Sequence, residues 1–477
     1  KSYLKGNLKV GFEISGTDAA VHAEGGAAVS EETLTLGIVD DPSILDATEE
    51  LLVPGGVVER LVTAIPEDDW RGGVEIVGWA YQFYVSERKD EFFKSKRKAA
   101  ADDIAPATQL FTPDYIVRFL VQNSLGRLWV LNNPGSALAD SMEYFIKPDP
   151  DSHEDFRRVS SPEEISVVDP SCGSGHFLCY AFDLLAAMYA ERGYRARDAA
   201  RLILEKNLDG IEIDPRAAAL TAFALTCKAC ELDGRFLRRG VEPRVTCLES
   251  IELTPEELST LPNTLEFGPL TDVLAHLGEV GSLWNPTNDE VGALDQLAHE
   301  AAAGPGLFAG TALGKLERAK GFARVLGTAH DICVTNPPYM GTGNLAPWMS
   351  AWVKKHYPSE KADLCTCFIS RGFSFARKDG YNAQVTMQSW MFLGSFEKMR
   401  KDIIENKGIV CMAHLGARAF DAIGGEVVQT TATVFENGKD SNEGTYLRLV
   451  DGKGEEAKIL AVTEAIGNPD CGWRYQA

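Results

Sequence analysis

Three features are missing from this sequence of 477 residues: a long apolar run, a signal-peptide pattern at its start and a long low-complexity tract. No apolar run approaches the roughly 20 residues that a membrane span requires, so we expect no membrane association. Without a secretory signal, the expected location is the cytoplasm. Hydrophobic residues make up 45% of the chain and charged residues 24%, which excludes global disorder and provides material for a full core.

Basic residues are scarce in two long segments. Residues 13–69 hold fourteen acidic residues and one basic residue, and residues 247–304 hold eleven acidic residues and no Lys or Arg. These segments account for the formal net charge of −22, because the rest of the chain is close to neutral. Such acidity argues at first against a nucleic-acid partner. The run SERKDEFFKSKRK at 86–98 is basic, and we interpret it as a solvated helix face, with phosphate binding as the alternative.

The sequence also lacks cysteines at the spacing of a metal site. The ten cysteines are irregularly spaced, which is typical of a reduced intracellular protein and not of a disulfide framework. Cys227 and Cys230 have CxxC spacing, but no second pair of ligands follows at the spacing of a zinc site. We therefore expect no metal, and we interpret cysteines such as Cys172 and Cys333 as packing residues.

Strands and helices alternate from residue 165 onward. The apolar stretch ISVVD, a Gly-rich turn and a helix are followed by a second strand and an Ala-rich helix. This alternation predicts an α/β fold with a doubly wound, mostly parallel sheet and a C-terminal antiparallel hairpin. The predicted strands span 165–169, 207–213, 245–248, 331–335, 384–388, 409–414 and 427–435, with helices at 177–192, 215–232 and 362–377.

The sequence predicts three regions. Residues 1–105 form a mainly helical N-terminal region, which we expect to be incomplete. Residues 106–437 form the α/β domain, with an acidic helical insertion at about 255–325, and residues 438–477 begin a C-terminal region or a linker to a further domain. At the start of the α/β domain, a short linker at 99–110 precedes a helix with Thr112 as its N-cap and Pro113 in its first turn.

The Gly-rich turn DPSCGSGHF at 169–177 lies at the carboxyl edge of the predicted sheet. Its glycines allow a ligand to approach the backbone closely. The second strand ends in GIEIDP at 210–215, which places Glu212 where a carboxylate can accept two hydrogen bonds from a ribose diol. The third position of a dinucleotide fingerprint is Leu178, and no GK[ST] motif is present. The turn therefore favours a ribose-bearing ligand without a pyrophosphate.

The fourth strand ends in Asn336-Pro337-Pro338-Tyr339. The two prolines fix the backbone and remove two N–H donors, which leaves a rigid loop rich in acceptors with one amide and one aromatic ring. An exocyclic amine on a planar ring needs acceptors for its two hydrogens and a face on which to stack. A plain turn is the alternative, which the position at a strand tip disfavours.

Four motifs together resemble the gamma-type N6-adenine DNA methyltransferases, which use S-adenosylmethionine (SAM): FTP at 111–113, DPSCGSGHF, GIEIDP and NPPY, in this order. The segment FTPDYIVRFLVQNSLGRLW is similar to the PglX-type methyltransferases of BREX phage-exclusion systems. The resemblance covers about residues 106–437 and implies a Rossmann-like SAM-dependent methyltransferase domain. It also implies a site-specific enzyme that acts on double-stranded DNA, with other proteins of the exclusion system as partners, and a target-recognition region mostly or wholly beyond this chain.

The resemblance further implies roles for individual residues in binding SAM. Phe111 and Thr112 contact its methionine part, Asp169 accepts from its amino group, and the backbone from Cys172 through Gly173 to Gly175 passes beside it. Glu212 holds the ribose hydroxyls, Ile213 packs on the adenine ring, and Glu249 accepts from the adenine amine, at a position where the family usually has Asp.

For the target base, the resemblance implies that Tyr339 stacks on a flipped adenine. The side-chain oxygen of Asn336 and the carbonyl of Pro337 accept the hydrogens of the N6 amine, on a loop that Pro338 helps to stiffen. The family places a second aromatic ring near the hairpin. Residues 425–429 contain none here, and Phe420 is the candidate.

Three other functions remain open on the sequence. NPPY also occurs in protein glutamine methyltransferases, which are compact and lack the FTP helix and the long insertion. An N4-cytosine enzyme is close in chemistry, but its loop usually begins with Ser or Asp. A SAM-binding recognition or assembly subunit with vestigial chemistry is the non-enzymatic alternative. For a DNA enzyme, the two acidic segments should face away from the duplex or contact protein partners.

Overall fold

The computed structural model describes the chain from residue 111 onward almost continuously, together with parts of 89–109. The described residues are 89, 91–92, 94–95, 97–99, 101–109, 111–148, 156–261, 267–304, 306–420, 428–438 and 443–477. Contacts divide the chain into residues 1–79 and residues 80–477, and all described residues belong to the second unit. Most of the predicted N-terminal region, the first acidic segment and the predicted hairpin turn near 424–425 lie outside the described residues.

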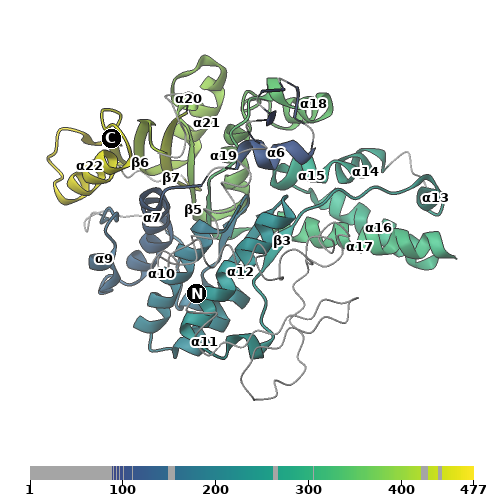
Figure 1. Ribbon diagram of the computed structural model, residues 1–477, viewed down its shortest axis with the longest axis horizontal. Helices are drawn as coiled ribbons and strands as arrows, with labels where there is room; N and C mark the ends of the chain where they lie inside the picture. Colours follow the sequence, from purple (N-terminus) through teal and green to yellow (C-terminus); the bar gives the residue numbers. More distant parts are fainter. Residues whose placement is uncertain are drawn as a thin grey trace, which may run out of the picture. The chain divides into compact units, whose positions relative to one another are not determined.

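One nine-stranded sheet organises the second unit, in the order β3-β2-β1-β4-β5-β7-β6-β8-β9 (Figure 1). Strands β3, β2, β1, β4 and β5 are parallel, and β7 is antiparallel to both β5 and β6. The predicted parallel sheet with an antiparallel hairpin is therefore confirmed. The strands are β1 (Val167–Asp169), β2 (Leu208–Glu212), β3 (Val245–Cys247), β4 (His330–Thr335), β5 (Ala376–Met387), β6 (Gly408–Ala417), β7 (Gln429–Glu436), β8 (Thr445–Arg448) and β9 (Arg474–Gln476).

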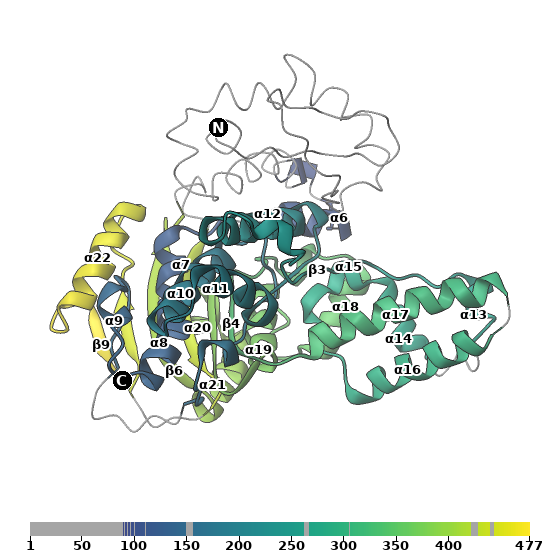
Figure 2. The same cartoon turned by 90° about the horizontal axis from the view of Figure 1, so that it is seen from below.

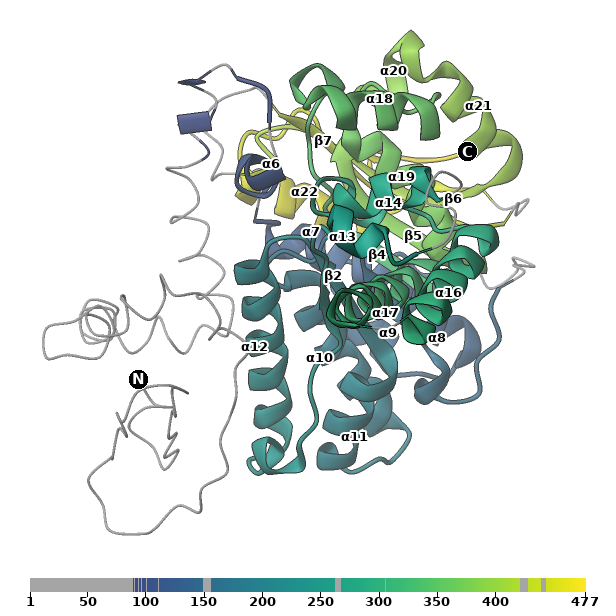
Figure 3. The ribbon, with the colours of Figure 1, turned by 90° about the vertical axis from the view of Figure 1, so that its right-hand side faces the viewer.

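Helices cover both faces of this sheet, as a doubly wound fold requires. On one side, α7 (Asp114–Val121), α10 (His176–Glu191), α11 (Ala196–Leu202) and α12 (Pro215–Leu232) pack together (Figure 3). On the other side, α19 (Leu364–Phe375) packs on β4 and β5, with α21 (Glu397–Asn406) nearby (Figure 2). The strands β1 and β4 between these layers are fully buried, which explains the short apolar run in each, Val167–Val168 in β1 and Ile332–Val334 in β4.

Two local predictions at the start of this unit are wrong. Residues 101–108, predicted as a linker, form helix α6 (Ala101–Thr108), because Ile104 and Ala107 are buried in the core despite Pro106 inside the helix. Thr112 is not an N-cap, since α7 starts at Asp114 after Pro113 and has no side-chain cap. The helix then continues through a π-helical turn (Gln122–Gly126) into α8 (Arg127–Asn132), with Leu125 and Leu128 buried.

The acidic insertion is helical, as predicted. It contains α13 (Pro255–Leu258), α14 (Gly268–Ala275), α15 (Leu277–Val280), a 3-10 turn (Gly281–Leu283), α16 (Asn288–Ala303) and α17 (Leu307–Gly327), and α16 and α17 run side by side (Figure 2). Several of its carboxylates are paired within the chain, because α17 supplies the cations that residues 247–304 lack. Glu249 pairs with Arg318, Glu257 with Lys315 and Asp295 with Lys320.

The sheet continues beyond residue 437. Strand β8 pairs in parallel with β6, and β9 pairs with β8 in the antiparallel direction. Helix α22 (Glu455–Gly467) connects β8 to β9 in the sequence. Another helix that the sequence did not indicate is α18 (Pro347–His356), which follows the NPPY loop. Among the helices of the described segments, none is both long enough and apolar enough to cross a membrane.

Candidate active site

The predicted site residues follow the carboxyl ends of neighbouring parallel strands. Asp169 ends β1 and pairs in register with Gly210 of β2, while Thr335 ends β4 and pairs with Gln384 of β5. Because β1 lies between β2 and β4, Asp169, Glu212 and the NPPY loop meet at one edge of the sheet. This is the edge at which doubly wound folds bind their ligands.

Asp169 is a buried carboxylate that suits a cationic group. It is 1% exposed, and its Oδ1 accepts a hydrogen bond from the Ser171 N–H at 3.1 Å. Among the described residues, its Oδ2 is buried without a hydrogen-bond partner. Burial raises the pKa of Asp169 to about 7, and the Thr335 hydroxyl and the Ser171 N–H offset this only in part. An ammonium group placed at Oδ2 would satisfy the buried oxygen and favour its ionised form.

The Gly-rich turn depends on two glycines with positive φ. Gly173 has φ 53° and Gly175 has φ 90°, a region that favours glycine. A Cβ on Gly175 would lie 3.2 Å from the backbone Cα of Thr221, so only glycine fits there without displacement. The Thr221 hydroxyl also donates to the Gly173 carbonyl at 2.7 Å, which ties the turn to α12. Cys172 is buried against Gly210, as expected for a packing residue.

Glu212 closes the other side of this turn. It is 6% exposed and accepts hydrogen bonds from the backbone N–H groups of Gly173 (2.7 Å), Ile213 (2.9 Å) and Asp214 (3.1 Å). Burial raises the pKa of Glu212, while these N–H donors lower it. A carboxylate has about four lone-pair sites, so Glu212 can still accept from a ribose hydroxyl while it holds the turn.

His176 is a site residue that the sequence reasoning missed. It begins α10, and its ring lies edge-on to Phe111 with a centroid separation of 3.8 Å. Its Nδ1 is 3.2 Å from the Ser174 hydroxyl, and burial lowers the pKa of His176 to about 3, so the ring is neutral. The only sequence signal was its place beside Gly175, and nothing local indicated that Phe111 would reach it.

The NPPY loop is fixed from two sides. The Asn336 Nδ2 donates to the Thr112 hydroxyl at 3.0 Å, which joins the FTP segment directly to the loop. The Tyr339 hydroxyl donates to the Val385 carbonyl of β5 at 3.0 Å, and burial raises the pKa of Tyr339 well above its usual range. Ser171, in the Gly-rich turn, lies within hydrogen-bond distance of both the Thr335 hydroxyl (2.8 Å) and the Asn336 carbonyl (3.3 Å). The FTP, Gly-rich and NPPY motifs therefore form one connected polar network.

The insertion is anchored directly to this site. The Ser282 hydroxyl donates to the Pro170 carbonyl at 2.5 Å, and Ile213 lies against Gly281, whose Cβ would be 3.0 Å away. The buried guanidinium of Arg371 on α19 donates to three carbonyls, those of Ser282, Trp284 and Leu326. The root of the insertion is therefore held beside the Gly-rich turn and next to Ile213.

Four further predicted positions lie as follows. Glu249 follows β3, and its half-exposed side chain pairs with Arg318 of α17. Phe420 is buried, at 3% exposure, just before residues that are not described. Pro337 is buried and Pro338 partly so. The cofactor and base contacts expected of these residues stay predictions.

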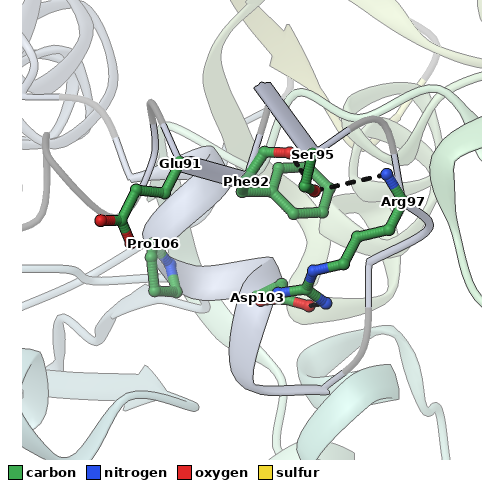
Figure 4. A pocket seen from close by; sticks show the side chains of 6 residues that line it. All are labelled: Glu91, Phe92, Ser95, Arg97, Asp103 and Pro106. Atoms are coloured by element: carbon green, nitrogen blue, oxygen red, sulfur yellow. Dashed lines mark hydrogen bonds and ion pairs between the residues drawn. The ribbon is translucent and has the colours of Figure 1, made fainter.

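The basic run 86–98 is described only in part. Within it, Arg97 forms a two-point ion pair with Asp103 and lies over the Phe92 ring at 5.6 Å. Together with Glu91, Ser95 and Pro106 these residues line a cavity of about 280 Å³ (Figure 4). Next to it, the Ala99 N–H donates to the Asn344 carbonyl at 2.7 Å, so this segment is attached just beyond the NPPY loop. No group of three or more His, Cys, Asp or Glu suited to a metal ion occurs in the described parts.

Comparison with protein families finds a match to a class of methylases. Residues 206–420 match the Eco57I restriction-modification methylase family, a segment that begins just before β2 and includes Glu212 and the NPPY loop. In these residues the chain is similar to a restriction-modification methylase, and they include strands of the doubly wound sheet from β2 to β6.

More specifically, the chain is similar to two curated adenine-specific methyltransferases, BrxX and PglX. It is 38% identical over 461 residues to BrxX of Escherichia coli O9:H4, covering 88% of this chain and 38% of the relative. It is also 38% identical over 470 residues to PglX of Lacticaseibacillus casei, covering 91% of this chain and 39% of the relative. The chain thus spans about two fifths of the length of these curated relatives. Among solved structures, the DrdV–DNA complex aligns with a TM-score of 0.45 and 14% identity, over 83% of this chain and 32% of that chain.

Proposed function

We propose that this chain is the catalytic portion of a site-specific DNA methyltransferase that transfers a methyl group from SAM to N6 of adenine in double-stranded DNA. The observation that carries the proposal is the connected network of FTP, Gly-rich turn and NPPY loop at one sheet edge. In it, the Thr112–Asn336 hydrogen bond links a predicted cofactor-binding residue to the predicted catalytic amide. The homology to BrxX and PglX supports adenine as the target and phage exclusion as the setting.

The residues present fit SAM. The buried Oδ2 of Asp169 suits the amino group of the methionine part, and Glu212 lies at the tip of β2, where a ribose would reach it. Phe111, Thr112 and the backbone of Cys172, Gly173 and Gly175 would line the methionine end, with Ile213 and Glu249 at the adenine end. When bound, SAM supplies a methyl group already activated by its sulfonium.

In this reaction the protein would position the N6 amine of the target adenine. The target base cannot reach this edge from within a duplex, so it must be flipped out at a cost of a few kcal/mol. Tyr339 would stack on the base, held in place by its bond to the Val385 carbonyl. The bond from Asn336 Nδ2 to Thr112 orients the amide so that Oδ1 faces away from Thr112. In this orientation Oδ1 and the Pro337 carbonyl would accept the two amine hydrogens, which favours a pyramidal nitrogen and stabilises its developing positive charge.

The experiment that tests this function measures labelled methyl transfer by the full-length protein together with its phage-exclusion partners. The expected product, after digestion of modified duplex DNA, is N6-methyladenine. Label in N4-methylcytosine, or in glutamine of a protein substrate, would assign one of the alternative activities. SAM binding without any product would indicate a recognition or assembly subunit. We place the activity in the cytoplasm, where it would mark host DNA, with partner proteins recruited to the same system.

The affinity for SAM is expected to depend on Asp169 and on pH. Burial raises the pKa of Asp169 from 3.8 to about 7, so the carboxyl must lose a proton to bind an ammonium group below that pH. The Kd for SAM should therefore rise by about tenfold per pH unit below about pH 7, because each bound SAM displaces one proton. In the ligand-free protein a rise in pH has an unfavourable effect. The folded state binds the Asp169 proton more tightly than the unfolded state, so the free energy of unfolding should fall as the pH rises from 3.8 to about 7.

Calorimetric titration with SAM between about pH 5.5 and 7 measures this dependence. In the Asp169→Asn variant the affinity should be weaker and nearly independent of pH. A wild-type affinity that does not change over this range would contradict the assignment of Asp169 to the amino group.

A further inference from the structure

Phe392 and Leu393 form an unusual apolar pair on the described surface. Phe392 is 63% exposed and Leu393 is 53% exposed. Single exposed apolar side chains are common on proteins and need no explanation. The other large ones in the described segments, Phe223, Leu237, Phe308, Ile404, Leu460 and Tyr475, do not adjoin one another in sequence. Two consecutive large apolar side chains directed to solvent instead present one continuous apolar tip.

This pair lies at the edge of the sheet that carries the candidate active site. It is in the segment that follows the carboxyl end of β5, where α20 (Ser389–Phe392) and a 3-10 turn (Gly394–Phe396) lead into α21 (Figure 1). β5 is the parallel neighbour of β4, and Tyr339 is bonded to the Val385 carbonyl near the end of β5. The exposed pair therefore follows the strand that fixes the proposed base-stacking ring.

Hydrogen bonds hold this segment in place, so the exposure of Phe392 and Leu393 does not result from a loose loop. Trp390 is 3% exposed, and its Nε1 donates to the Thr386 hydroxyl at 3.2 Å. Arg400 on α21 donates to the carbonyls of Trp390 and Leu393, both at 2.7 Å. A buried indole and a guanidinium thus hold the backbone on both sides of Phe392 and leave its ring outside the core.

The surroundings of the pair suit a duplex. Between Gln388 and Asn406, the end of α21, the chain has three basic and three acidic residues and is therefore neutral, in a protein with a net charge of −22. Lys398 and Lys401, at the start of α21, are exposed to solvent. On the other side, the Phe392 ring lies 5.8 Å from the ring of His414 on β6. The apolar tip therefore lies beside a neutral segment of an acidic protein, in which Lys401 pairs with Glu405 at 3.7 Å and the exposed Lys398 can reach a phosphate.

We propose that Phe392 and Leu393 are a wedge that enters the duplex and fills the space left by the flipped adenine. This inference rests on the proposed function, since it needs a base that leaves the stack. Apolar side chains inserted between bases offset the loss of stacking that base extrusion causes. The pair would thus contact the DNA duplex and keep the adenine extruded.

The test uses the full-length protein and two duplexes that contain its recognition site, read beforehand from DNA methylated by the wild type. In one duplex the target adenine is paired with thymine, and in the other it lies opposite an abasic position. The Phe392→Ala/Leu393→Ala double variant should lose about ten- to a hundredfold in kcat/KM on the paired duplex. On the abasic duplex its loss should stay within about threefold, because no base pair has to be broken there and the unpaired adenine leaves the stack more easily.

Matched control variants distinguish a role as a wedge from the general effect of removing an exposed apolar side chain. Phe308→Ala and Leu460→Ala remove comparably exposed side chains, from α17 and α22, and should leave both substrates unaffected. Phe392→Leu, which keeps an apolar tip, should retain most of the activity, and SAM affinity should not change in any of these variants. An equal loss on both duplexes, or no loss on the paired one, would overturn the wedge. Failure of the proposed function is distinguishable, because the wild type would then methylate adenine in neither duplex.

Discussion

The Asn336→Ala variant should be catalytically inactive, with methyl transfer reduced by about a thousandfold or more and SAM affinity preserved. The amide oxygen of Asn336 is the side-chain acceptor assigned to the reacting amine, and its loss removes stabilisation that exists only as charge develops on N6. The fold should persist, since the loop is also held by the Tyr339–Val385 and Ser171–Asn336 backbone contacts. Labelled transfer to DNA and calorimetric SAM titration measure the two quantities separately.

Two variants sharpen this test. Asn344→Ala, an exposed asparagine of the same loop, should behave as wild type. Thr112→Val removes the group that accepts from Asn336 Nδ2. If Thr112 positions Asn336, kcat should fall, whereas a role limited to cofactor contact would raise only the KM for SAM. Unchanged turnover in Asn336→Ala would refute the assignment of the NPPY loop to adenine chemistry.

The parts of the site that follow from short-range patterns could be predicted from the sequence. The Gly-rich turn, Glu212 at the tip of β2 and NPPY after β4 each depend on a strand and the few residues after it. Parallel strand order then brings them to one edge without further information. Residues 215–232 were likewise predicted as the helix that is now α12, which begins with Pro215 after the Asp214 cap.

The parts that depend on contacts distant in sequence could not be predicted. Thr112 looked like a helix cap, but its hydroxyl serves Asn336, 224 residues away. The ion pair of Glu249 with Arg318, 69 residues further along the chain, had no local signal, and the expected cofactor contact of Glu249 stays a prediction. Residues 101–108 contain a proline and two consecutive aspartates, and they are helical because the core covers Ile104 and Ala107. In each case tertiary packing decided between local alternatives of similar energy.

Glu212→Ala should weaken SAM binding by about one to two orders of magnitude. Three of the about four lone-pair sites of this carboxylate accept backbone N–H groups, so one ribose hydroxyl can donate to it, and this charge-assisted bond contributes about 1.5–3 kcal/mol. The carboxylate also holds the Gly173 N–H at 2.7 Å, so its removal loosens the turn that lines the methionine end. Both effects act on the cofactor, and the rate at saturating SAM should change much less than the Kd.

The Glu212→Gln variant separates these two effects. Its amide oxygen can still accept from the backbone N–H groups of Ile213 and Asp214, which both contact Oε1, whereas the amide nitrogen that replaces Oε2 cannot accept from the Gly173 N–H. The turn should therefore be retained in part, and more of it than in Glu212→Ala. Its affinity should lie between those of wild type and Glu212→Ala, because an uncharged oxygen accepts more weakly from ribose hydroxyls. The matched control is Asp209→Asn, which removes a carboxylate at the opposite end of β2, where it pairs with Arg244 at 2.8 Å. This control should leave the Kd for SAM within about twofold, which is under 0.5 kcal/mol. An equal loss of affinity in Asp209→Asn and Glu212→Gln would mean that β2 stability, and not a ribose contact, determines binding.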